Sequence, residues 1–469
     1  MIHNKIMTLE RTFKSMKTNH LDKYLKKYTR MSERELAHTV KSNLWFTPVL
    51  YVFFSIILLT LALNGDLHYD LGDKMRPYFA VDYDLTLSLL SILTAATLTI
   101  TIFTFNLVLV VFTTFSGQFS PRILKNFIAS KATQRVLGIF TGSFIYVLLS
   151  LFFINKRITE YYFAVPLTAT FLAIFSMATF IFFINHAVAW LQVNQMTDDM
   201  KKEALGIVKG TLKNELDIYK VKDFNDTNAD IRNGKGIQIK AGSPGYIQLV
   251  DFISMIEEAQ KDDITIKLEY TIGSYVFETT PLLTYWKKHE TLIDEDKYLA
   301  FFSVRKKQTE VQDIEFSINK LVEVAIRALG NYDPKTATTA IYQVGEILVS
   351  ISQVTDFSNY LVDDENNLRI ILQKRDFNHY LYNGLGYIRH YAKDNVIVST
   401  DILKVLDLMA KSLHPRDYPS VWDFAIHTAI GFENLFLFEQ DSQQFYLALF
   451  DLATTTDNLE DYEKFLKKI

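Results

Sequence analysis

The sequence has 469 residues, of which 49% are apolar and 22% charged, with a formal net charge of −4 and no cysteine. These averages conceal four blocks, 44–63, 85–115, 136–154 and 163–191, that contain no Asp, Glu, Lys or Arg. Such blocks exclude an ordinary soluble enzyme, a disordered chain and a fibrous repeat, and the missing cysteine excludes a disulfide framework. The near-neutral charge gives no bulk basicity for binding nucleic acid.

The four blocks predict four transmembrane helices within a domain spanning 44–191. A hydrocarbon core of roughly 30 Å needs ~20 apolar residues of helix. Block 85–115 would be about 46 Å long as one helix at ~1.5 Å per residue, so we expect it to tilt or project beyond the bilayer. Buried helices of a large soluble core are the alternative, which four uncharged blocks of this length make a poor explanation.

Basic residues in the connecting segments predict the orientation of the chain. The cytoplasmic N-terminal segment, 1–43, carries ten Lys and Arg, and the 116–135 loop carries four, whereas the 64–84 and 155–162 loops carry two each. Because basic loops stay on the cytoplasmic side, we expect a multi-pass membrane protein with both termini in the cytoplasm. The long basic and polar start does not resemble a secretory signal.

The 116–135 loop contains a predicted interfacial helix. Ser120 stands at the N-cap position and Pro121 at the first helical position. An apolar stripe behind them is flanked by Arg122 and Lys125, which is typical of a helix lying on the inner leaflet. A simple basic connector is the alternative.

The second apolar block is rich in hydroxyl groups, which fall on two stripes at ~100° per residue. One stripe holds Thr86, Thr94, Thr97, Thr101 and Thr104, and the opposite one holds Ser88, Ser91, Thr99, Asn106 and Thr113. One hypothesis is a path for an ion or solute. The alternative is that the hydroxyls bond carbonyls of their own helix or join neighbouring helices. Asn106 is costly to leave unpaired in lipid, so we expect it to have a partner.

The third and fourth blocks each contain one notable pair. Gly138 and Gly142 form a step of small residues that lets another helix approach closely, and packing within the bundle is the favoured interpretation over dimerisation. Asn185 and His186 stand near the inner end of the fourth block. An intramembrane histidine can relay protons, and an interfacial polar cap is the alternative.

The remaining chain predicts a helix and linker over 192–235, a small β-rich module over 236–304 and an α-helical cytoplasmic domain over 305–469. The helix at 198–219 is expected to continue from the fourth span. Within the module we predict a strand at 246–250, a helix at 252–261 and an alternating strand at 264–272. The end of the module, from Gly273 to Pro281, is similar to barrel-sandwich folds. Asp333 and Pro334 open a later helix. The fold class is therefore mostly α, an integral membrane protein with a small β module and a C-terminal helical bundle.

Few residues suggest catalytic or metal chemistry. The sequence has no Gly-rich phosphate loop, no Gly-x-Ser-x-Gly and no paired metal spacing. We therefore expect no catalytic residues, no metal, no cofactor and no enzymatic activity. The charge-dense segment 305–313 precedes a helix, where it could bind an anion, and a solvated connector is the alternative. His379 and His390 lie three turns apart on one predicted helix, too far to ligate one ion.

Several short segments together resemble a bacterial family called domain of unknown function 2254, described as predicted membrane proteins. These are Leu44-Trp45-Phe46, Gln118-Phe-Ser-Pro-Arg122, Val136-Leu-Gly138, Gly245-Tyr-Ile-Gln248, and Gln312-Asp313 with Leu321-Val322. The similarity runs from about residue 40 to the 350s. The family's Asn-Asp-Pro step reads Asn331-Tyr-Asp-Pro334 here. The resemblance implies the membrane topology, a place in the bacterial inner membrane and one continuous architecture, and it implies no activity.

Two function hypotheses follow. The first is an oligomeric ion or small-solute channel or transporter, with a path along Thr94, Thr97, Thr101 and Thr104 and with Asn106, Asn185 and His186 as further candidates. The second is a membrane-anchored sensor or scaffold that binds a cytoplasmic protein partner, since residues 192–469 are more soluble chain than a simple channel needs. The expected partners are the lipid bilayer and further copies of the chain, without nucleic acid.

Overall fold

The computed structural model describes residues 45–75, 80–118, 130–156, 158–190, 192–210, 219–221, 236–287, 293–309, 311–393, 395–432 and 436–467, apart from the side chains of 114–118. Segment 1–43 and the predicted interfacial helix, with Ser120, Pro121, Arg122 and Lys125, lie outside the described residues. The chain divides into a membrane unit, residues 1–114 with 124–189, and a C-terminal unit, residues 115–123 with 190–469.

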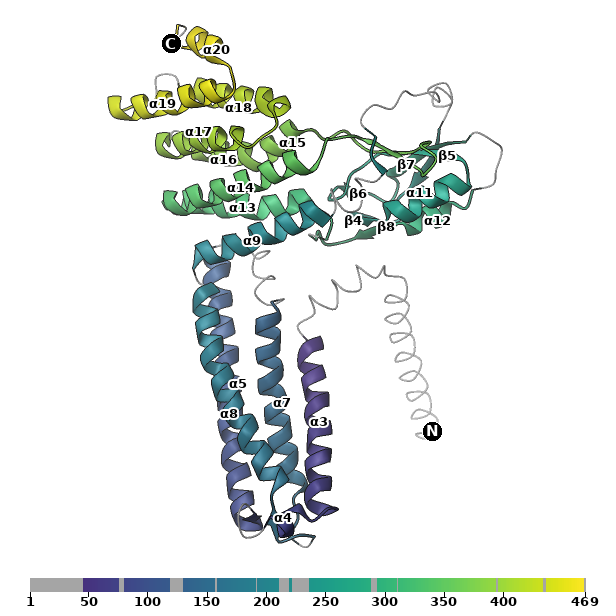
Figure 1. The fold of residues 1–469 in the computed structure, drawn as a ribbon, viewed down its shortest axis with the longest axis vertical. Coiled ribbons are helices and arrows are strands. Elements are labelled where there is room, and N and C mark those ends of the chain that lie inside the picture. Colours follow the sequence, from purple (N-terminus) through teal and green to yellow (C-terminus); the bar gives the residue numbers. More distant parts are fainter. Residues whose placement is uncertain are drawn as a thin grey trace, which may run out of the picture. The chain divides into compact units, whose positions relative to one another are not determined.

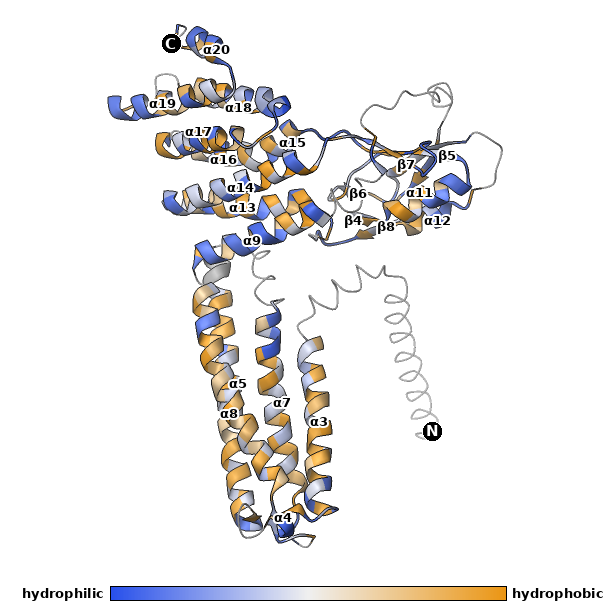
Figure 2. Cartoon of the chain, viewed as in Figure 1, coloured by the Kyte–Doolittle hydropathy of each residue, from blue (hydrophilic) through white to orange (hydrophobic). Residues whose placement is uncertain are grey.

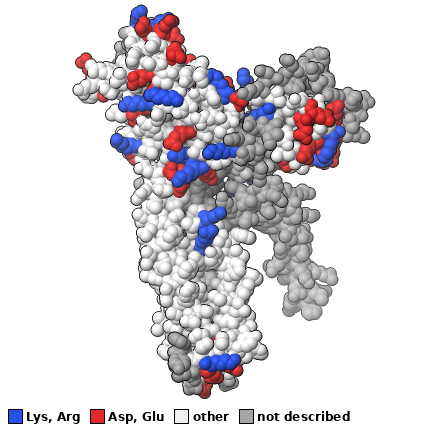
Figure 3. All heavy atoms as spheres, in the orientation of Figure 1, with Lys and Arg blue, Asp and Glu red and all other residues white. Residues whose placement is uncertain are grey.

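The membrane unit consists mainly of four long apolar helices (Figures 1 and 2). They are α3 (Phe46–Leu67), α5 (Tyr83–Gln118), α7 (Lys131–Phe153) and α8 (Ala164–Trp190). Each is long and apolar enough to cross a membrane, which confirms the four predicted spans. A helix pairs its own backbone polar groups, so lipid tolerates it. Charged side chains are sparse along the helices in Figure 3. Half of the apolar stretch of α7 is buried within the unit, against 22% or less for the others, so α7 is the central helix.

Short elements close one end of the membrane unit. Helix α4 (Leu71–Lys74) and strand β1 (Val81–Asp82) lie between α3 and α5, and strand β2 (Tyr161–Tyr162) precedes α8. Strands β1 and β2 pair antiparallel, and α4 packs against β2. The fit is close, because a Cβ on Gly72 would lie 2.0 Å from the carbonyl oxygen of Tyr161. Glycine is therefore required at this contact.

A buried carboxylate ties the last turn of α3 to the first turn of α8. Asp66 is 0% exposed. Its oxygens accept hydrogen bonds from the backbone N–H groups of Phe163 (3.1 Å), Ala164 (2.8 Å) and Val165 (2.9 Å). These are N–H groups that have no partner within a helix at its start. Asp66 therefore caps a helix from a distance of about a hundred residues in sequence.

The C-terminal unit begins with α9 (Val193–Ile207). The expectation that this helix continues from the fourth span is wrong, because α8 ends at Trp190 and Gln192 has an extended backbone with ψ 114°. Two sheets follow, a five-stranded sheet of order β3-β7-β5-β10-β9 and a three-stranded sheet of order β6-β4-β8. Their strands are β3 (Ile237–Lys240), β4 (Gly245–Val250), β5 (Ile264–Leu268), β6 (Tyr275–Val276), β7 (Pro281–Lys287), β8 (Phe302–Arg305), β9 (Tyr360–Val362) and β10 (Leu368–Ile371).

Two helices accompany the sheets. Helix α11 (Phe252–Lys261) forms at the predicted residues, with the Asp251 side chain accepting the N–H of Ser254 at its start, and it packs on β5 and β10. Helix α12 (Glu295–Ala300) lies directly before β8. Ile256, Ile266 and Leu283 are among the buried residues of the shared core.

Strands β9 and β10 correct the prediction that 305–469 is entirely helical. They lie between two helices of that segment, and β10 pairs in parallel with β5 through Ile370 and Ile266. The five-stranded sheet is thus built from two distant parts of the chain. The barrel-sandwich interpretation of the module is wrong for the same reason, because it assumed a sheet complete within 236–304.

The other helices form successive packed layers (Figure 1). They are α13 (Ile314–Gly330), α14 (Pro334–Val354), α15 (Phe377–Leu381), the π-helix η3 (Tyr382–Gly386), α16 (Tyr387–Ala392), α17 (Val396–Ala410), the 3-10 helix η4 (Pro415–Asp417), α18 (Tyr418–Ile430), α19 (Glu439–Thr455) and α20 (Leu459–Leu466). Helix α9 packs on α13 and α14, α14 packs on α17, and α17 packs on α19. Asp333 and Pro334 start α14 as predicted, with the N–H of Thr336 donating to the Asp333 side chain.

Candidate functional site

The predicted path residues of the second span all lie on α5, and their hydroxyls bond their own helix. Thr97 and Thr104 are buried in the membrane unit, and Thr94 and Thr101 are half-buried. Each hydroxyl donates to the carbonyl four residues earlier: Thr94 to Leu90, Thr97 to Leu93, Thr101 to Thr97 and Thr104 to Ile100, at 2.7–2.9 Å. This is the arrangement expected from the alternative to a solute path.

The other predicted polar residues of the spans lie nearer the surface of the membrane unit. Asn106 on α5 and Asn185 on α8 are exposed within the unit, and His186 is half-buried. The imidazole of His186 stacks on the ring of Phe182, with 6.1 Å between centroids and 9° between planes.

Gly138 and Gly142 lie where α7 packs against α3. A Cβ on Gly138 would lie 2.7 Å from Cδ2 of Tyr51, and one on Gly142 would lie 2.7 Å from Oγ of Ser55. Neither helix could approach as closely with larger residues at these positions.

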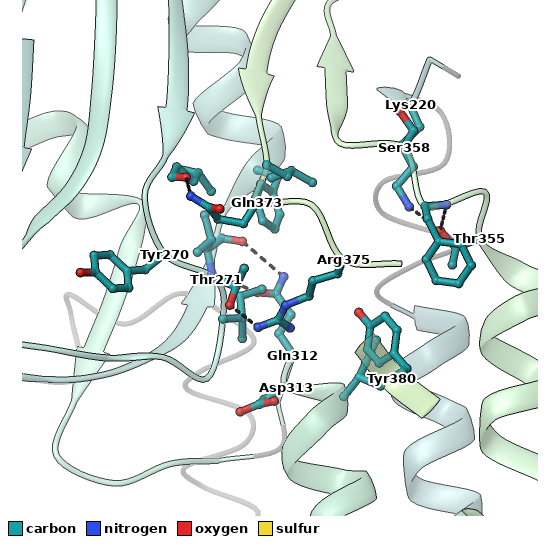
Figure 4. Close-up of a pocket in the computed structure, with 17 residues that line it drawn as sticks. Lys220, Tyr270, Thr271, Gln312, Asp313, Thr355, Ser358, Gln373, Arg375 and Tyr380 are labelled. Atoms are coloured by element: carbon teal, nitrogen blue, oxygen red, sulfur yellow. Dashed lines mark hydrogen bonds between the residues drawn. The ribbon is translucent and has the colours of Figure 1, made fainter. Parts of the chain in front are cut away.

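The C-terminal unit holds a cavity of about 120 Å³ between its sheets and its helical layers. Its walls come from the ends of β4 and β5, the start of α13, the segment between α14 and β9, and the segment between β10 and α15. It is lined by Lys220, Val250, Phe252, Leu268, Tyr270, Thr271, Ile272, Gln312, Asp313, Ile314, Thr355, Phe357, Ser358, Leu372, Gln373, Arg375 and Tyr380 (Figure 4).

Two cationic side chains line this cavity. Arg375 forms an ion pair with Glu315 at 2.6 Å and donates to the hydroxyl of Thr271. Lys220 donates to the hydroxyl of Thr355 at 3.0 Å. The two cations approach from different segments of the chain, and Figure 4 shows Arg375 to the left of Tyr380 and Lys220 above it.

The segment that carries Lys220 is joined to the edge of the five-stranded sheet. Lys220 forms a β-bridge with Leu361, and the N–H of Val221 donates to the carbonyl of Tyr360 at 3.4 Å. Ser358 also donates its hydroxyl to the carbonyl of Val221. This short segment therefore forms one wall of the cavity, and it pairs through these backbone contacts with the side of β9 that faces away from β10.

Asp313 begins α13 at the floor of the cavity. Its Oδ1 accepts the N–H of Phe316 at 2.9 Å, and its Oδ2 accepts from the amide of Gln308 at 2.9 Å. Burial raises the pKa of Asp313, an effect that these hydrogen bonds oppose. Gly273 passes directly over the carboxyl with φ +87°, where a Cβ would lie 2.3 Å from Oδ2. Only glycine fits this contact and this backbone conformation.

Two glutamines and a tyrosine complete the polar lining. Gln312 accepts from the N–H of Val250 at 3.0 Å and donates to its carbonyl at 3.3 Å, which extends the edge of β4. Gln373 donates to the carbonyl of Leu268 at 3.1 Å. Burial raises the pKa of Tyr380, so its hydroxyl stays protonated at neutral pH and can donate.

The sequence indicated one part of this site. Asp313 belongs to the charge-dense segment that we considered as an anion site at a helix start. Lys220, Arg375 and Tyr380 were missed, because no local pattern joins them. His379, by contrast, lies beside the cavity, with Nε2 2.8 Å from the Glu315 carboxylate that also holds Arg375. Within the described residues, no group of three or more His, Cys, Asp and Glu side chains is arranged to hold a metal ion.

Four apolar helices joined to a C-terminal unit of sheets and helices define an integral membrane protein with a large second unit. The family model described as "Predicted membrane protein (DUF2254)" matches residues 41–407, and the chain belongs to this family. The match continues past the 350s, where the resemblance was expected to end.

Similar proteins include uncharacterized proteins of Mycobacterium bovis and Mycobacterium tuberculosis, each 25% identical over 310 residues. The aligned region covers 63% of this chain and 58% of each relative. The chain therefore spans less than two thirds of the length of these relatives. No solved structure matches the chain.

Proposed function

We propose that this protein is a membrane-anchored receptor for a small ligand. In this proposal the four spans anchor the chain in the bacterial inner membrane, with both termini and the C-terminal unit in the cytoplasm. The observation that carries the proposal is the cavity between the sheets and the helical layers, which combines charged, amide and hydroxyl groups with apolar walls. Ligand sites in proteins have this composition.

The contacts of α13 support a receptor over a passive anchor. Residues at the start of α13 form the floor of the cavity, and farther along the same helix Lys320 pairs with Glu203 of α9 at 3.3 Å. Helix α9 is held a second time by an ion pair between Lys201 and Glu346 of α14 at 2.9 Å. Because α9 follows the last span after two residues, a ligand that orders the start of α13 would also affect the membrane-proximal helix.

Native mass spectrometry of the full chain, purified from its own membranes in mild detergent, tests this proposal. We expect a bound small-molecule mass on the wild type and its loss from Thr271→Trp, whose indole would fill the cavity. Thr454→Trp is the control, because Thr454 is exposed on α19 and donates to the Phe450 carbonyl. Identical spectra for all three proteins, with each one folded by circular dichroism, would contradict the receptor.

An oligomeric channel or transporter is the second candidate, and one observation favours it. Asn106 is exposed on the membrane unit, in the same stripe as Ser88, Ser91 and Thr99, which are exposed too. Lipid offers an amide no hydrogen-bond partner, whereas a second copy of α5 does.

This candidate predicts an oligomer in native mass spectra that weakens in Asn106→Leu, together with ion or solute flux from proteoliposomes. The control is Asn64→Leu, an exposed asparagine near the end of α3. A monomeric wild type without flux would exclude a channel of this kind. A scaffold that binds a cytoplasmic protein partner remains a prediction, to be tested by comparing the partners of the full chain with those of a chain lacking 220–469.

A further inference from the structure

We propose that the cavity of the C-terminal unit binds a small carboxylate with a compact apolar body, whose carboxylate group lies between Arg375 and Lys220. This inference rests on the proposed receptor function and specifies the ligand class. It is carried by three features of the cavity: the charge of its lining, the setting of Arg375, and the size of its apolar part.

The lining carries more positive than negative charge. Lys220 and Arg375 are its two cations, and Asp313 is the one acid among the described residues that line it. The carboxyl of Asp313 is 3% exposed and its two oxygens are engaged by Phe316 and Gln308. Both oxygens of Asp313 therefore serve contacts at the start of α13 rather than a ligand.

Neighbouring side chains hold the Arg375 guanidinium in place without occupying all of its N–H donors. Glu315 and the hydroxyl of Thr271 fix the guanidinium, and the side chain of Tyr380 lies against it. A guanidinium has five N–H donors in a rigid planar fork, more than these three neighbours require. Such a fork matches the two oxygens of a carboxylate.

Glu315 also limits which anion fits. Its contact with Arg375 offsets part of the positive charge, so the site suits an anion of charge −1 better than one of higher charge. Figure 4 shows the hydroxyl end of Tyr380 turned toward the Arg375 side of the cavity, with Lys220 above Tyr380 in this view. Tyr380 can thus donate to the same carboxylate, with the ammonium of Lys220 as a second charge.

The remaining lining is apolar and sets the body of the ligand. Its apolar members are Val250, Phe252, Leu268, Ile272, Ile314, Phe357 and Leu372. The volume of about 120 Å³ is similar to that of an engineered apolar cavity of about 150 Å³ that admits benzene. A single aromatic ring or a short branched chain fits this space, and benzoate is therefore a suitable probe.

Isothermal titration calorimetry on the full chain in detergent, first freed of copurified ligand by repeated washing, tests the inference. The probes are benzoate, benzyl alcohol and inorganic phosphate. We expect benzoate to bind at least tenfold more tightly than benzyl alcohol, and phosphate not to compete. Arg375→Gln should weaken benzoate binding at least tenfold. Arg327→Gln, the same substitution in the last turn of α13 and outside the cavity, should leave it unchanged.

The outcomes separate the ligand class from the receptor. Equal binding of benzoate and benzyl alcohol, with no effect of Arg375→Gln, would overturn the carboxylate site while leaving a ligand-binding cavity. Binding of phosphate in place of benzoate would overturn it as well, and so would the absence of any binding in a folded wild type. If Arg375→Gln does not fold, Arg375→Lys keeps the charge and loses the fork. Unchanged benzoate affinity in that variant would contradict the bidentate contact.

Discussion

Asp66 shows how one acidic residue at the edge of an apolar helix can organise two spans. Its carboxylate is fully buried and accepts three backbone N–H groups at the start of α8, where the helix dipole also favours negative charge. In the sequence it stands among the four other acids of the 64–84 loop and carries no distinguishing pattern. Its capping role becomes visible only in the structure, where Phe163, 97 residues later in the chain, comes within hydrogen-bond distance of the Asp66 carboxylate.

Asp66→Asn should destabilise the membrane unit. The amide keeps one accepting oxygen but turns an NH₂ group toward the N–H of Val165, so one charged hydrogen bond becomes a repulsive contact. We expect a loss of about 1.5–3 kcal/mol, the range for hydrogen bonds to charged groups. Thermal unfolding in detergent measures it. Asp70→Asn, an exposed residue in the left-handed region that asparagine tolerates, is the control. Equal midpoints for the two variants would contradict the capping role.

Asp313 makes the C-terminal unit sensitive to pH. Because burial raises its pKa in the folded state, the unfolded chain loses this proton at lower pH than the folded chain. The associated stability is present below the ordinary aspartate value, about 3.9, and is lost as the pH rises through the raised pKa. The slope should not exceed about 1.4 kcal/mol per pH unit for a single proton.

Asp313→Asn tests this pH dependence. Asparagine is also a good N-cap, so the variant keeps the start of α13 but has no proton to lose. We expect its stability, relative to the wild type, to increase with pH from about 4 upward, measured by chemical unfolding followed through circular dichroism. Asp333→Asn, which changes the corresponding cap of α14 at an exposed position, should show no such trend. Parallel pH profiles for wild type and Asp313→Asn would rule out the raised pKa.

At the scale of elements, the sequence predicted those helices whose formation depends on neighbouring residues in the chain. The four spans, α11 and the start of α14 follow from uncharged blocks, an amphipathic period and an Asp-Pro cap. The strands β9 and β10 were missed, because each is short and the inward-facing Arg369 interrupts the apolar run of β10. The partner of β10 in the rest of the sheet, β5, lies about a hundred residues away. The cavity was missed for the same reason, since its walls come from six separate segments.

Arg369 holds β10 in the five-stranded sheet through a buried ion-pair network. It contacts Asp363 at 2.6 Å and Asp263 at 2.8 Å, and both Arg369 and Asp363 are 4% exposed. Burial alone would raise the pKa of Asp363, but hydrogen bonds from Arg369 and Asn367 outweigh burial and lower it. The pair therefore stays ionised within the folded unit.

Arg369→Gln should cost about 3–5 kcal/mol, the penalty for leaving a buried charge without its partner. Lys464→Gln removes one side of an exposed pair with Asp461, which should cost far less because water solvates the carboxylate that is left. Chemical unfolding of both variants gives the comparison. If the two losses were similar, the network would not be what anchors β10.

At the scale of the whole molecule, the question is how the C-terminal unit communicates along the chain toward the spans. Lys320 is 3% exposed, pairs with Glu203 of α9 and lies over the ring of Phe316, which follows the cavity floor by three residues. It is therefore the buried link between the cavity and the helix that comes directly after α8. The described contacts of α9 with α14 add a second attachment that does not involve the cavity floor.

Lys320→Gln should weaken this link while leaving the cavity intact. We expect faster hydrogen exchange in α9, because its ion pair with α13 is lost, and unchanged exchange in β4 and β5. Benzoate should slow exchange in α9 of the wild type and have a smaller effect in the variant. Lys335→Gln, exposed in the first turn of α14, is the control. Equal benzoate effects in wild type and Lys320→Gln would place the coupling elsewhere, since ligand binding would then reach α9 without this contact.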